Sequence, residues 1–324
     1  MKYNLLDGTG LYVSEISLGT MTFGKEIDKP TAHCLMSKAI EDGINLIDTA
    51  DLYNAGVSEK YIGEWLKNRR SEVLLATKAA FQIHDRVNSK GLSKYHIVNA
   101  VEDSLRRLQT DHIDIFYLHL PDYSTRIEET IIALKLLLDQ GKIRYYGMSN
   151  YSSWQTAEFV ETARKMQVEK PLFSQNVYNL ITRGIEPELL PCLENYTINL
   201  TTYNPLAAGL LTGKYHLEQK DETGRLTTNP MYRDRYFSDV KLAATSELME
   251  IASGAGLTIT ELAFKWVLQH KVVKSMILGV SSMEQYETNL RICSEDPTLS
   301  PEVVEKCDAV YRRIPVSEIF SYLR

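Results

Sequence analysis

The chain has 324 residues, of which 44% are hydrophobic, and a formal net charge of −6. This length could hold two average domains, but single α/β domains routinely reach it, and we expect one domain over residues 1–324. The negative charge argues against nucleic acid or an anionic membrane as the main partner. No apolar run is long enough to span a membrane, because Lys135 interrupts the best candidate, Ile131 to Leu138.

The cysteines and the first residues predict a cellular compartment. Cys34, Cys192, Cys293 and Cys307 show no Cys-x-x-Cys spacing, and Met1 is not followed by a basic and then apolar leader. Both features predict a cytoplasmic protein with reduced thiols. We expect no bound metal, because the sequence has no His-Glu-x-x-His motif and no carboxylate cluster.

Strand-like and helix-like segments alternate along the chain. It begins with two short strands, Tyr3 to Leu6 and Leu11 to Val13, joined as a hairpin. Amphipathic segments such as Ser93 to Leu108 then alternate with short apolar runs. The runs that we interpret as strands are Glu15–Leu18, Ile44–Asp48, Val73–Thr77, Ile113–Leu118, Ile143–Met148, Phe173–Val177, Ile198–Tyr203 and Met276–Leu278. This alternation predicts a closed parallel (β/α)8 barrel, a TIM barrel, with the hairpin across its floor and extra C-terminal helices.

Polar side chains stand at or just after the ends of three of these runs. Asp48 ends one run, Lys78 and His119 follow two others, and Tyr53 comes five residues after Asp48. The carboxyl ends of parallel barrel strands open onto one face, so these residues should converge. Taken singly, Lys78 would be a solvated strand end and His119 a core histidine. Together, a phenol, an amine, a carboxylate and an imidazole suit proton transfer to a carbonyl oxygen.

Two nucleotide-binding signatures are incomplete. Gly8-Thr9-Gly10 has no third glycine and no following helix. Gly209 to Tyr215 is one residue too short for a P-loop and ends in Tyr where Ser or Thr is required. The sequence therefore supports neither an open-sheet dinucleotide fold nor a nucleoside triphosphatase.

Several motifs resemble those of the aldo-keto reductases. They are Gly43 to Tyr53 followed by Ser58-Glu59, Ala76 to Lys78, Leu118 to Asp122, and Gly147 to Tyr151, within a similarity that runs from Leu18 to Asn289. Inside the family, Tyr203 to Tyr215 and Ile277 to Asn289 look most like the aflatoxin-aldehyde reductase branch and the potassium-channel β-subunit branch. The resemblance implies reduction of an aldehyde or ketone to an alcohol with a nicotinamide cofactor.

The resemblance also implies roles for the four converging residues. Tyr53 would be the proton donor, Lys78 and Asp48 would tune it, and His119 would orient the carbonyl. A free phenol titrates near pH ~10, but a cation within ~4 Å stabilises the phenolate by up to a few kcal/mol. Lys78 is the candidate cation, and its burial would require an anionic partner such as Asp48.

A cofactor site follows from the same resemblance. Tyr203 would stack on the nicotinamide, and the segment from Asn204 to Lys214 would be the pyrophosphate loop. The helix after Gly279 would present its N-terminus to phosphate, although Ser282 and Gln285 also fit a capping box. The expected cofactor contacts are Gly19, Thr20, Met21, Asp48, Ser149, Asn150, Gln175, Tyr203, Asn204, Pro205, Leu206, Ala208, Gly209, Lys214, Arg225, Gly279, Ser281, Gln285 and Asn289.

The choice between NADP and NAD rests on few residues. Many family members carry basic residues at the positions of Gly279 and Gln285, and this chain does not. Lys214 and Arg225 occupy positions comparable to a Lys and an Arg that grip the 2′-phosphate in closer relatives. We therefore expect NADP(H), with NAD as the alternative. The polar stretch Leu217 to Tyr236 is expected to be a mobile flap that orders over the bound cofactor.

Substrate residues should come from the loops at the barrel mouth. The expected contacts are Phe23, Tyr53, Phe81, His119, Tyr151 and Arg233, with Arg235 as an alternative to Arg233. The aromatic side chains suggest a hydrophobic or flat carbonyl compound, and the arginines suggest a carboxylate-bearing aldehyde. The assembly state is open and includes a homodimer.

Two other functions remain as alternatives. The chain could be a cofactor-sensing regulatory or binding subunit that keeps the barrel but works through partners. It could also be a barrel lyase or isomerase that uses Lys78 as a Schiff base. Turnover with carbonyl compounds separates the first alternative from a reductase, and borohydride trapping would reveal the second.

Overall fold

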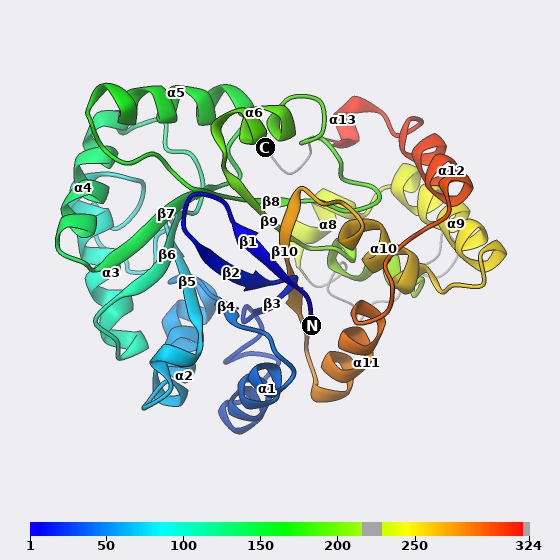
Figure 1. Cartoon of the computed structure of the whole chain (residues 1–324), viewed down its shortest axis with the longest axis horizontal. Helices are drawn as coiled ribbons and strands as arrows, with labels where there is room; N and C mark the ends of the chain where they lie inside the picture. The colour runs from blue at the N-terminus through cyan, green and yellow to red at the C-terminus, as the bar shows by residue number, and fades with distance from the viewer. Residues whose placement is uncertain (216–228, 320–324) are drawn as a thin grey trace.

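Eight parallel strands close into a barrel in the computed structural model, which describes residues 1–215 and 229–319. The strand order around the barrel is β10-β3-β4-β5-β6-β7-β8-β9, and helices surround it (Figure 1). The barrel strands are β3 (Ile16–Gly19), β4 (Leu46–Asp48), β5 (Leu74–Ala79), β6 (Ile113–Leu118), β7 (Ile143–Ser149), β8 (Phe173–Val177), β9 (Asn199–Tyr203) and β10 (Val273–Gly279). The prediction of a (β/α)8 barrel is confirmed.

The helices follow the strands in the expected alternation. They are α1 (Lys29–Glu41), α2 (Val57–Trp65), α3 (Lys94–Leu108), α4 (Ile127–Asp139), α5 (Ser153–Lys165), α6 (Leu189–Tyr196), α8 (Pro230–Tyr236), α9 (Asp239–Gly254), α10 (Ile259–Leu268), α11 (Met283–Cys293), α12 (Pro301–Tyr311) and α13 (Val316–Ile319). The amphipathic pattern after Ser93 is confirmed as α3, where Ser93 accepts a hydrogen bond from the His96 amide and caps the helix. Among the described residues, no helix has both the length and the apolar character to cross a bilayer.

The barrel strands are buried on both faces because helices cover the outside and side chains fill the inside. All six residues of β6 and all five of β8 are buried. Strand limits differ slightly from the apolar runs: β4 begins only at Leu46, and β5 continues to Ala79. Lys78 therefore lies inside its strand rather than just after it.

The hairpin lies across one end of the barrel (Figure 1). Its strands β1 (Tyr3–Leu6) and β2 (Leu11–Ser14) pair antiparallel, with Leu5 opposite Tyr12. The Asn4 side chain donates to the Lys274 carbonyl over 2.8 Å, near the start of β10. Leu6 and Val13 pack against residues inside the barrel, including Leu46 and Phe173. The hairpin closes the floor, as predicted, so the mouth at the other end remains for chemistry.

The segment Leu217 to Tyr236 contains a helix that was not predicted. Residues 217–228, including Arg225, lie outside the described residues, but Pro230–Tyr236 forms the helix α8. The helix begins with a proline, which suits the first helical position. Tyr232 and Tyr236, one helical turn apart, are both buried. The prediction missed this helix because the polar residues around these tyrosines masked the helical spacing.

A largely buried cluster around Arg183 connects the C-terminal helices to the barrel. The Arg183 guanidinium contacts Glu186 at 2.7 Å and Asp308 of α12 at 2.6 Å. The same group lies over the rings of Trp266 in α10 and Tyr311 in α12, at 4.8 and 4.7 Å from their centroids. This cluster joins the segment after β8 to Trp266 of α10 and to α12, which lie more than eighty residues after Arg183 in the chain.

Candidate active site

The four converging residues come from neighbouring strands at the mouth of the barrel. Asp48 is the last residue of β4, Lys78 lies near the end of β5, and His119 directly follows β6. These three strands are adjacent in the barrel, and Tyr53 reaches the same place from η1 (Tyr53–Gly56), a short turn after β4. The predicted convergence is therefore present in the structure.

Lys78 is the centre of the cluster. Its ammonium donates to Asp48 Oδ1 at 2.6 Å, to the Thr49 carbonyl at 2.7 Å and to the Tyr53 hydroxyl at 3.3 Å. The Lys78 side chain is 1% exposed, so solvent does not screen the pair. The second oxygen of Asp48 accepts from Gln175 Nε2 at 2.8 Å. Asp48 is thus held from both sides and keeps Lys78 aimed at Tyr53.

An unusual backbone turn brings Tyr53 to Lys78. The two residues after Tyr53, Asn54 and Ala55, both have left-handed backbone, with φ of 49° and 53°. Asn54 stabilises this turn because its side-chain amide donates to the carbonyls of Met21 at 3.1 Å and Phe23 at 2.6 Å. Asparagine tolerates left-handed backbone better than most residues. The sequence interpretation did not single out Asn54, although an Asn directly after the motif tyrosine was a usable signal.

Burial opposes ionisation of Tyr53. Desolvation raises the pKa of the Tyr53 phenol well above its ordinary value, and the Asp48 carboxylate adds to the effect. Desolvation also lowers the pKa of Lys78, against the pull of Asp48. The phenol therefore stays protonated at neutral pH, as a resting proton donor must. The stabilisation of the phenolate by Lys78 matters only as the proton leaves.

His119 is held as a neutral imidazole beside Tyr53. Its ring meets Tyr53 and Phe81 edge to face, with centroids 6.3 and 4.9 Å away. Desolvation, helped by the Lys78 charge, lowers the pKa of His119 well below its ordinary value. The Nδ1 atom is shielded from solvent and has no hydrogen-bond partner in the structure. A neutral ring with an unpartnered nitrogen can hydrogen-bond to a substrate oxygen.

The residues expected around a nicotinamide carboxamide are also side by side. Ser149 Oγ donates to the Gln175 carbonyl at 2.9 Å, and Asn150 Oδ1 accepts from the Tyr203 hydroxyl at 2.6 Å. Asn150 Nδ2 donates to the His119 carbonyl at 3.0 Å. These contacts link β7, β8 and β9 to the same mouth that holds the Lys78 cluster.

The expected phosphate side lies after β9 and β10. The turn η3 (Ala207–Thr212) contains Gly209 at a φ of 97°, a left-handed conformation that favours glycine. At the start of α11, Ser282 accepts from the Gln285 amide at 3.1 Å, while Gln285 Oε1 accepts from the Ser281 amide at 2.7 Å. Helix capping therefore occurs at this position. Asn289, one turn further, is buried and its Nδ2 has no partner in the structure.

A sequence model described as "Aldo/keto reductase family" matches residues 15–312. The chain belongs to the aldo/keto reductase family. A protein of Oryza sativa subsp. japonica named "Probable voltage-gated potassium channel subunit beta" is 35% identical over 322 residues, covering 97% of this chain and 98% of its own. A human protein named "Aflatoxin B1 aldehyde reductase member 2" is 36% identical over 306 residues, covering 89% of this chain and 84% of its own. These matches confirm the resemblance stated from the motifs.

The expected substrate residues of this aldo/keto reductase differ in how exposed their side chains are. Phe81 is 37% exposed beside His119, whereas Phe23 is fully buried in the core and Tyr151 packs against Phe159 of α5. Arg233 is exposed on α8. Arg235, the alternative, is half-buried and forms a hydrogen bond with Tyr203.

The helix α8 adds a contact at the mouth that the sequence interpretation missed. The Tyr232 hydroxyl donates to Met21 Sδ at 3.5 Å. Tyr232 also contributes to the raised pKa of the Tyr53 phenol, although less than desolvation and Asp48. Recognition of the helical spacing of Tyr232 and Tyr236 would have found it.

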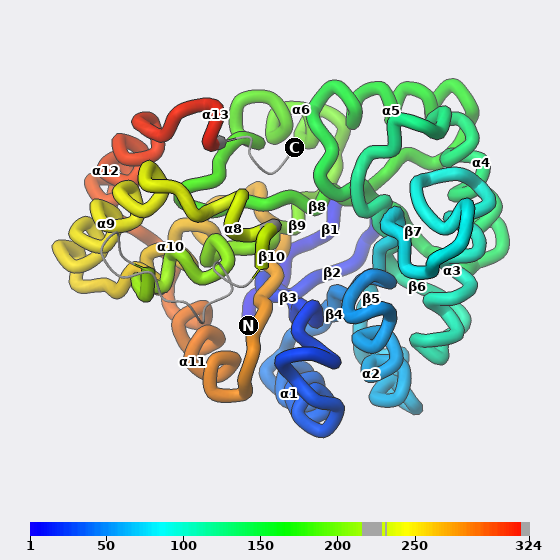
Figure 2. Tube along the Cα trace, turned by 180° about the vertical axis from the view of Figure 1, so that it is seen from behind, coloured from blue at the N-terminus to red at the C-terminus, as the bar shows by residue number. Residues whose placement is uncertain are grey.

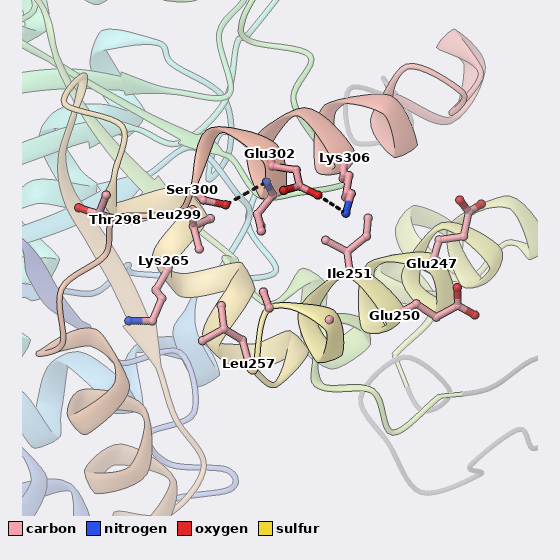
Figure 3. A pocket seen from close by; sticks show the side chains of 13 residues that line it. Glu247, Glu250, Ile251, Leu257, Lys265, Thr298, Leu299, Ser300, Glu302 and Lys306 are labelled. Atoms are coloured by element: carbon pink, nitrogen blue, oxygen red, sulfur yellow. Dashed lines mark hydrogen bonds and ion pairs between the residues drawn. The ribbon is translucent and has the colours of Figure 1, made fainter.

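A separate hollow lies among the C-terminal helices (Figure 3). Its volume is about 670 Å³, and its walls come from α9, α10, α12, the connection between α9 and α10, and the segment before α12. Ile251 and Leu257 are among its apolar wall residues, and Glu247, Glu250 and Glu302 among its carboxylates. None of the wall residues belongs to the predicted site.

Within residues 1–215 and 229–319, no three His, Cys, Asp or Glu side chains are grouped to hold a metal.

Proposed function

We propose that this chain reduces aldehydes or ketones to alcohols with NADPH, and that Tyr53 donates the proton. The observation that carries the proposal is the contact of the Lys78 ammonium with both Asp48 and Tyr53, at 2.6 and 3.3 Å, beside a neutral His119. Among the relatives, the name aflatoxin B1 aldehyde reductase supports carbonyl reduction.

The residues present fit a nicotinamide dinucleotide. The buried Nδ2 of Asn289 lacks a partner, as expected of a group that meets a ligand. A side-chain carbon at Gly279 would meet nothing within 4 Å, so the start of α11 is open on that side. The amide and hydroxyl groups of Ser149, Asn150 and Gln175 match the donors and acceptors of a carboxamide. When bound, the reduced cofactor supplies the hydride.

The chain's own residues would then act on the carbonyl oxygen. His119 would hydrogen-bond to that oxygen and orient it. Tyr53 would transfer its hydroxyl proton to the oxygen as negative charge develops there, and Lys78 would stabilise the phenolate left behind. Asp48 would keep Lys78 charged despite its burial. General acid catalysis of this kind contributes roughly 10²–10⁴-fold to rate.

The Schiff-base alternative for Lys78 has less support. A lowered pKa is a property of Schiff-base lysines. However, the Lys78 nitrogen already meets a carboxylate, a backbone carbonyl and a phenol, and its side chain is 1% exposed. An amine in these contacts has little room to attack a carbonyl carbon.

The decisive experiment measures NADPH oxidation with a panel of aldehydes and ketones. We expect turnover by the wild type and a fall of at least ~10²-fold in Tyr53→Phe, the scale of a lost general acid. NADPH affinity should stay within a few-fold. The control is Tyr146→Phe, because that hydroxyl binds the Glu169 carbonyl and is not in the Lys78 cluster. Near-normal turnover of Tyr53→Phe would remove Tyr53 from its role.

One observation favours a second function. A relative that is matched over 98% of its own length is named a probable voltage-gated potassium channel subunit beta. A cofactor-sensing subunit would bind NADPH but turn over no member of the carbonyl panel. Tight NADPH binding without turnover would therefore favour the regulatory function over the reductase.

A further inference from the structure

Asp51 is a buried carboxyl group for which the catalytic scheme above has no use. It lies two residues before Tyr53, and its backbone amide donates to the Lys78 carbonyl at 3.1 Å. Its exposure is 0%, and neither carboxyl oxygen has a hydrogen-bond partner in the structure. A buried, ionised and unpartnered carboxylate is strongly unfavourable, so Asp51 needs an explanation.

The cations near Asp51 already have other partners. Lys78 binds Asp48, and Arg107 of α3 binds Glu59 of α2 through Nε at 2.6 Å. Glu59 is fully buried and also accepts from Thr77 Oγ1 at 2.7 Å. Three carboxyl groups, Asp48, Asp51 and Glu59, thus share two cations.

Arg107 makes its direct hydrogen bonds with Glu59 and Ser104 rather than with Asp51. Gly56 has a φ of 83°, and a side-chain carbon there would lie 2.6 Å from Arg107 Cδ. A glycine at the end of η1 therefore lets the arginine pass. The Arg107 guanidinium also donates to Ser104 Oγ at 3.1 Å, which holds it along its own helix. Asp51 is left as the carboxyl group without a direct hydrogen-bond partner, although Arg107 and Lys78 are close enough to attract its charge.

We propose that Asp51 is a positioning residue that carries a proton in the resting protein and, by losing it as pH rises, weakens Tyr53 as an acid. While Asp51 is neutral, Lys78 faces one anion, Asp48, and stays aimed at the phenol. Once ionised, Asp51 competes for Lys78 and adds a negative charge next to Tyr53. The inference rests on the proposed role of Tyr53.

The electrostatics agree with this geometry. Desolvation, followed by repulsion from Glu59, raises the pKa of Asp51 well above its ordinary value. Arg107, the Leu52 amide and Lys78 oppose the shift but are weaker. The Asp51 charge in turn raises the pKa of the Tyr53 phenol. Ionisation of Asp51 would therefore make Tyr53 a poorer proton donor.

Stability against pH tests the protonation state without any need for catalysis. The pKa of Asp51 is higher in the folded protein than in the unfolded chain, where it is near ~4. The stabilisation that comes from protonated Asp51 is therefore fully present below the unfolded pKa and is lost as pH rises toward the folded pKa. Asp51→Asn keeps a neutral side chain at every pH, so its stability does not decrease in this way. We expect the unfolding midpoint of Asp51→Asn, relative to wild type, to rise as pH increases above the unfolded pKa of ~4. A difference that does not change with pH would overturn the proposal.

Infrared spectroscopy gives a second, independent reading of the same group. A protonated buried carboxyl has a carbonyl stretch that an ionised one lacks, and we expect this band in the wild type and its loss in Asp51→Asn. Asp114→Asn is the matched control, because Asp114 is equally buried but is paired with Arg70 at 2.5 Å, so the band should survive. A spectrum in which Asp51→Asn removes no such band would contradict the proposal.

The functional part is tested by the pH profile of turnover. We expect the turnover of Asp51→Asn, divided by that of wild type, to increase as pH rises, since Asn cannot ionise. A constant ratio would remove Asp51 from control of Tyr53. These tests distinguish failure of this inference from failure of the proposed function. The pH dependence of stability and the infrared band can both be measured in a protein that turns over no carbonyl compound.

Discussion

At the residue scale, the site is governed by desolvation as much as by charge. Tyr53, Lys78 and His119 all have pKa values displaced toward their neutral forms, and desolvation is the largest cause for each. Lys78 nevertheless keeps an anion, Asp48, in direct contact. The proposed function requires such a cluster to exchange one proton with a substrate while Lys78 and Asp48 keep their charges.

His119 should therefore not titrate in the working pH range. In the folded protein its pKa lies well below the ordinary value of ~6.5. The stabilisation that comes from neutral His119 is therefore present above pH ~6.5 and is lost as pH falls through the folded pKa. We expect kcat/KM with a neutral aldehyde to show no acid limb near pH ~6.5. An acid limb there that disappears in His119→Gln would show that the imidazole ionises.

His119→Gln should also retain more activity than Tyr53→Phe. Glutamine still offers a hydrogen bond to the substrate oxygen, whereas phenylalanine offers no proton. We expect a loss of roughly tenfold to a hundredfold in kcat for His119→Gln, below that for the loss of the general acid. Equal losses in the two variants would mean that His119 takes part in proton transfer rather than orientation.

At the element scale, the loop after β9 and the helix after β10 form the expected phosphate side. Lys214 is exposed at the end of that loop, with its ammonium 5.0 Å from the Tyr215 ring centroid. The N-terminus of α11 adds a favourable dipole for an anion. Both features favour a cofactor that carries an additional phosphate.

We expect NADPH to bind at least tenfold more tightly than NADH. The 2′-phosphate would meet Lys214 or the start of α11, and charge-assisted contacts of this kind are worth ~1–3 kcal/mol. Fluorescence titration of both cofactors measures the ratio, and Lys214→Met should reduce it. Lys271→Met, a change of an exposed lysine just before β10, is the control. Equal affinities for the two cofactors would indicate dual or NAD use.

At the scale of the whole molecule, one buried ion cluster holds the C-terminal helices against the barrel. Arg183 is shared by Glu186 after β8, Trp266 of α10, and Asp308 and Tyr311 of α12, which come from three separate parts of the chain. Its removal leaves two carboxylates without their cation in a largely buried place. Breaking a buried ion pair in this way is strongly destabilising.

We expect Arg183→Met to lower the free energy of unfolding by ~3–5 kcal/mol. The control is Arg312→Met, because the Arg312–Glu305 pair is exposed on both sides and should contribute less than ~1 kcal/mol. Urea denaturation measures both variants. If Arg183→Met lowers the free energy of unfolding no more than Arg312→Met does, the packing of the aromatic rings and α12 does not depend on the ion cluster.

The sequence by itself determined the barrel and its polar mouth. Alternating strand-like and helical segments required a closed parallel sheet, and residues at strand ends such as Asp48 and His119 then had to converge. These inferences succeed because the period of hydrophobic residues and the strand ends are local properties of the chain. The capping of α11 by Ser282 was likewise foreseeable from spacing alone.

Only the tertiary structure decided which polar groups have partners. Gln175 holds Asp48 from a distant part of the chain, and Asn54 holds the Tyr53 turn through the carbonyls of Met21 and Phe23. The local sequence does not predict these long-range partners. The state of Asp51 likewise depends on Arg107 being taken by Glu59, which follows from the packing of α2 against α3. Charge pairing in a buried site depends on distances and on exclusion of water, and both arise only when the chain has folded.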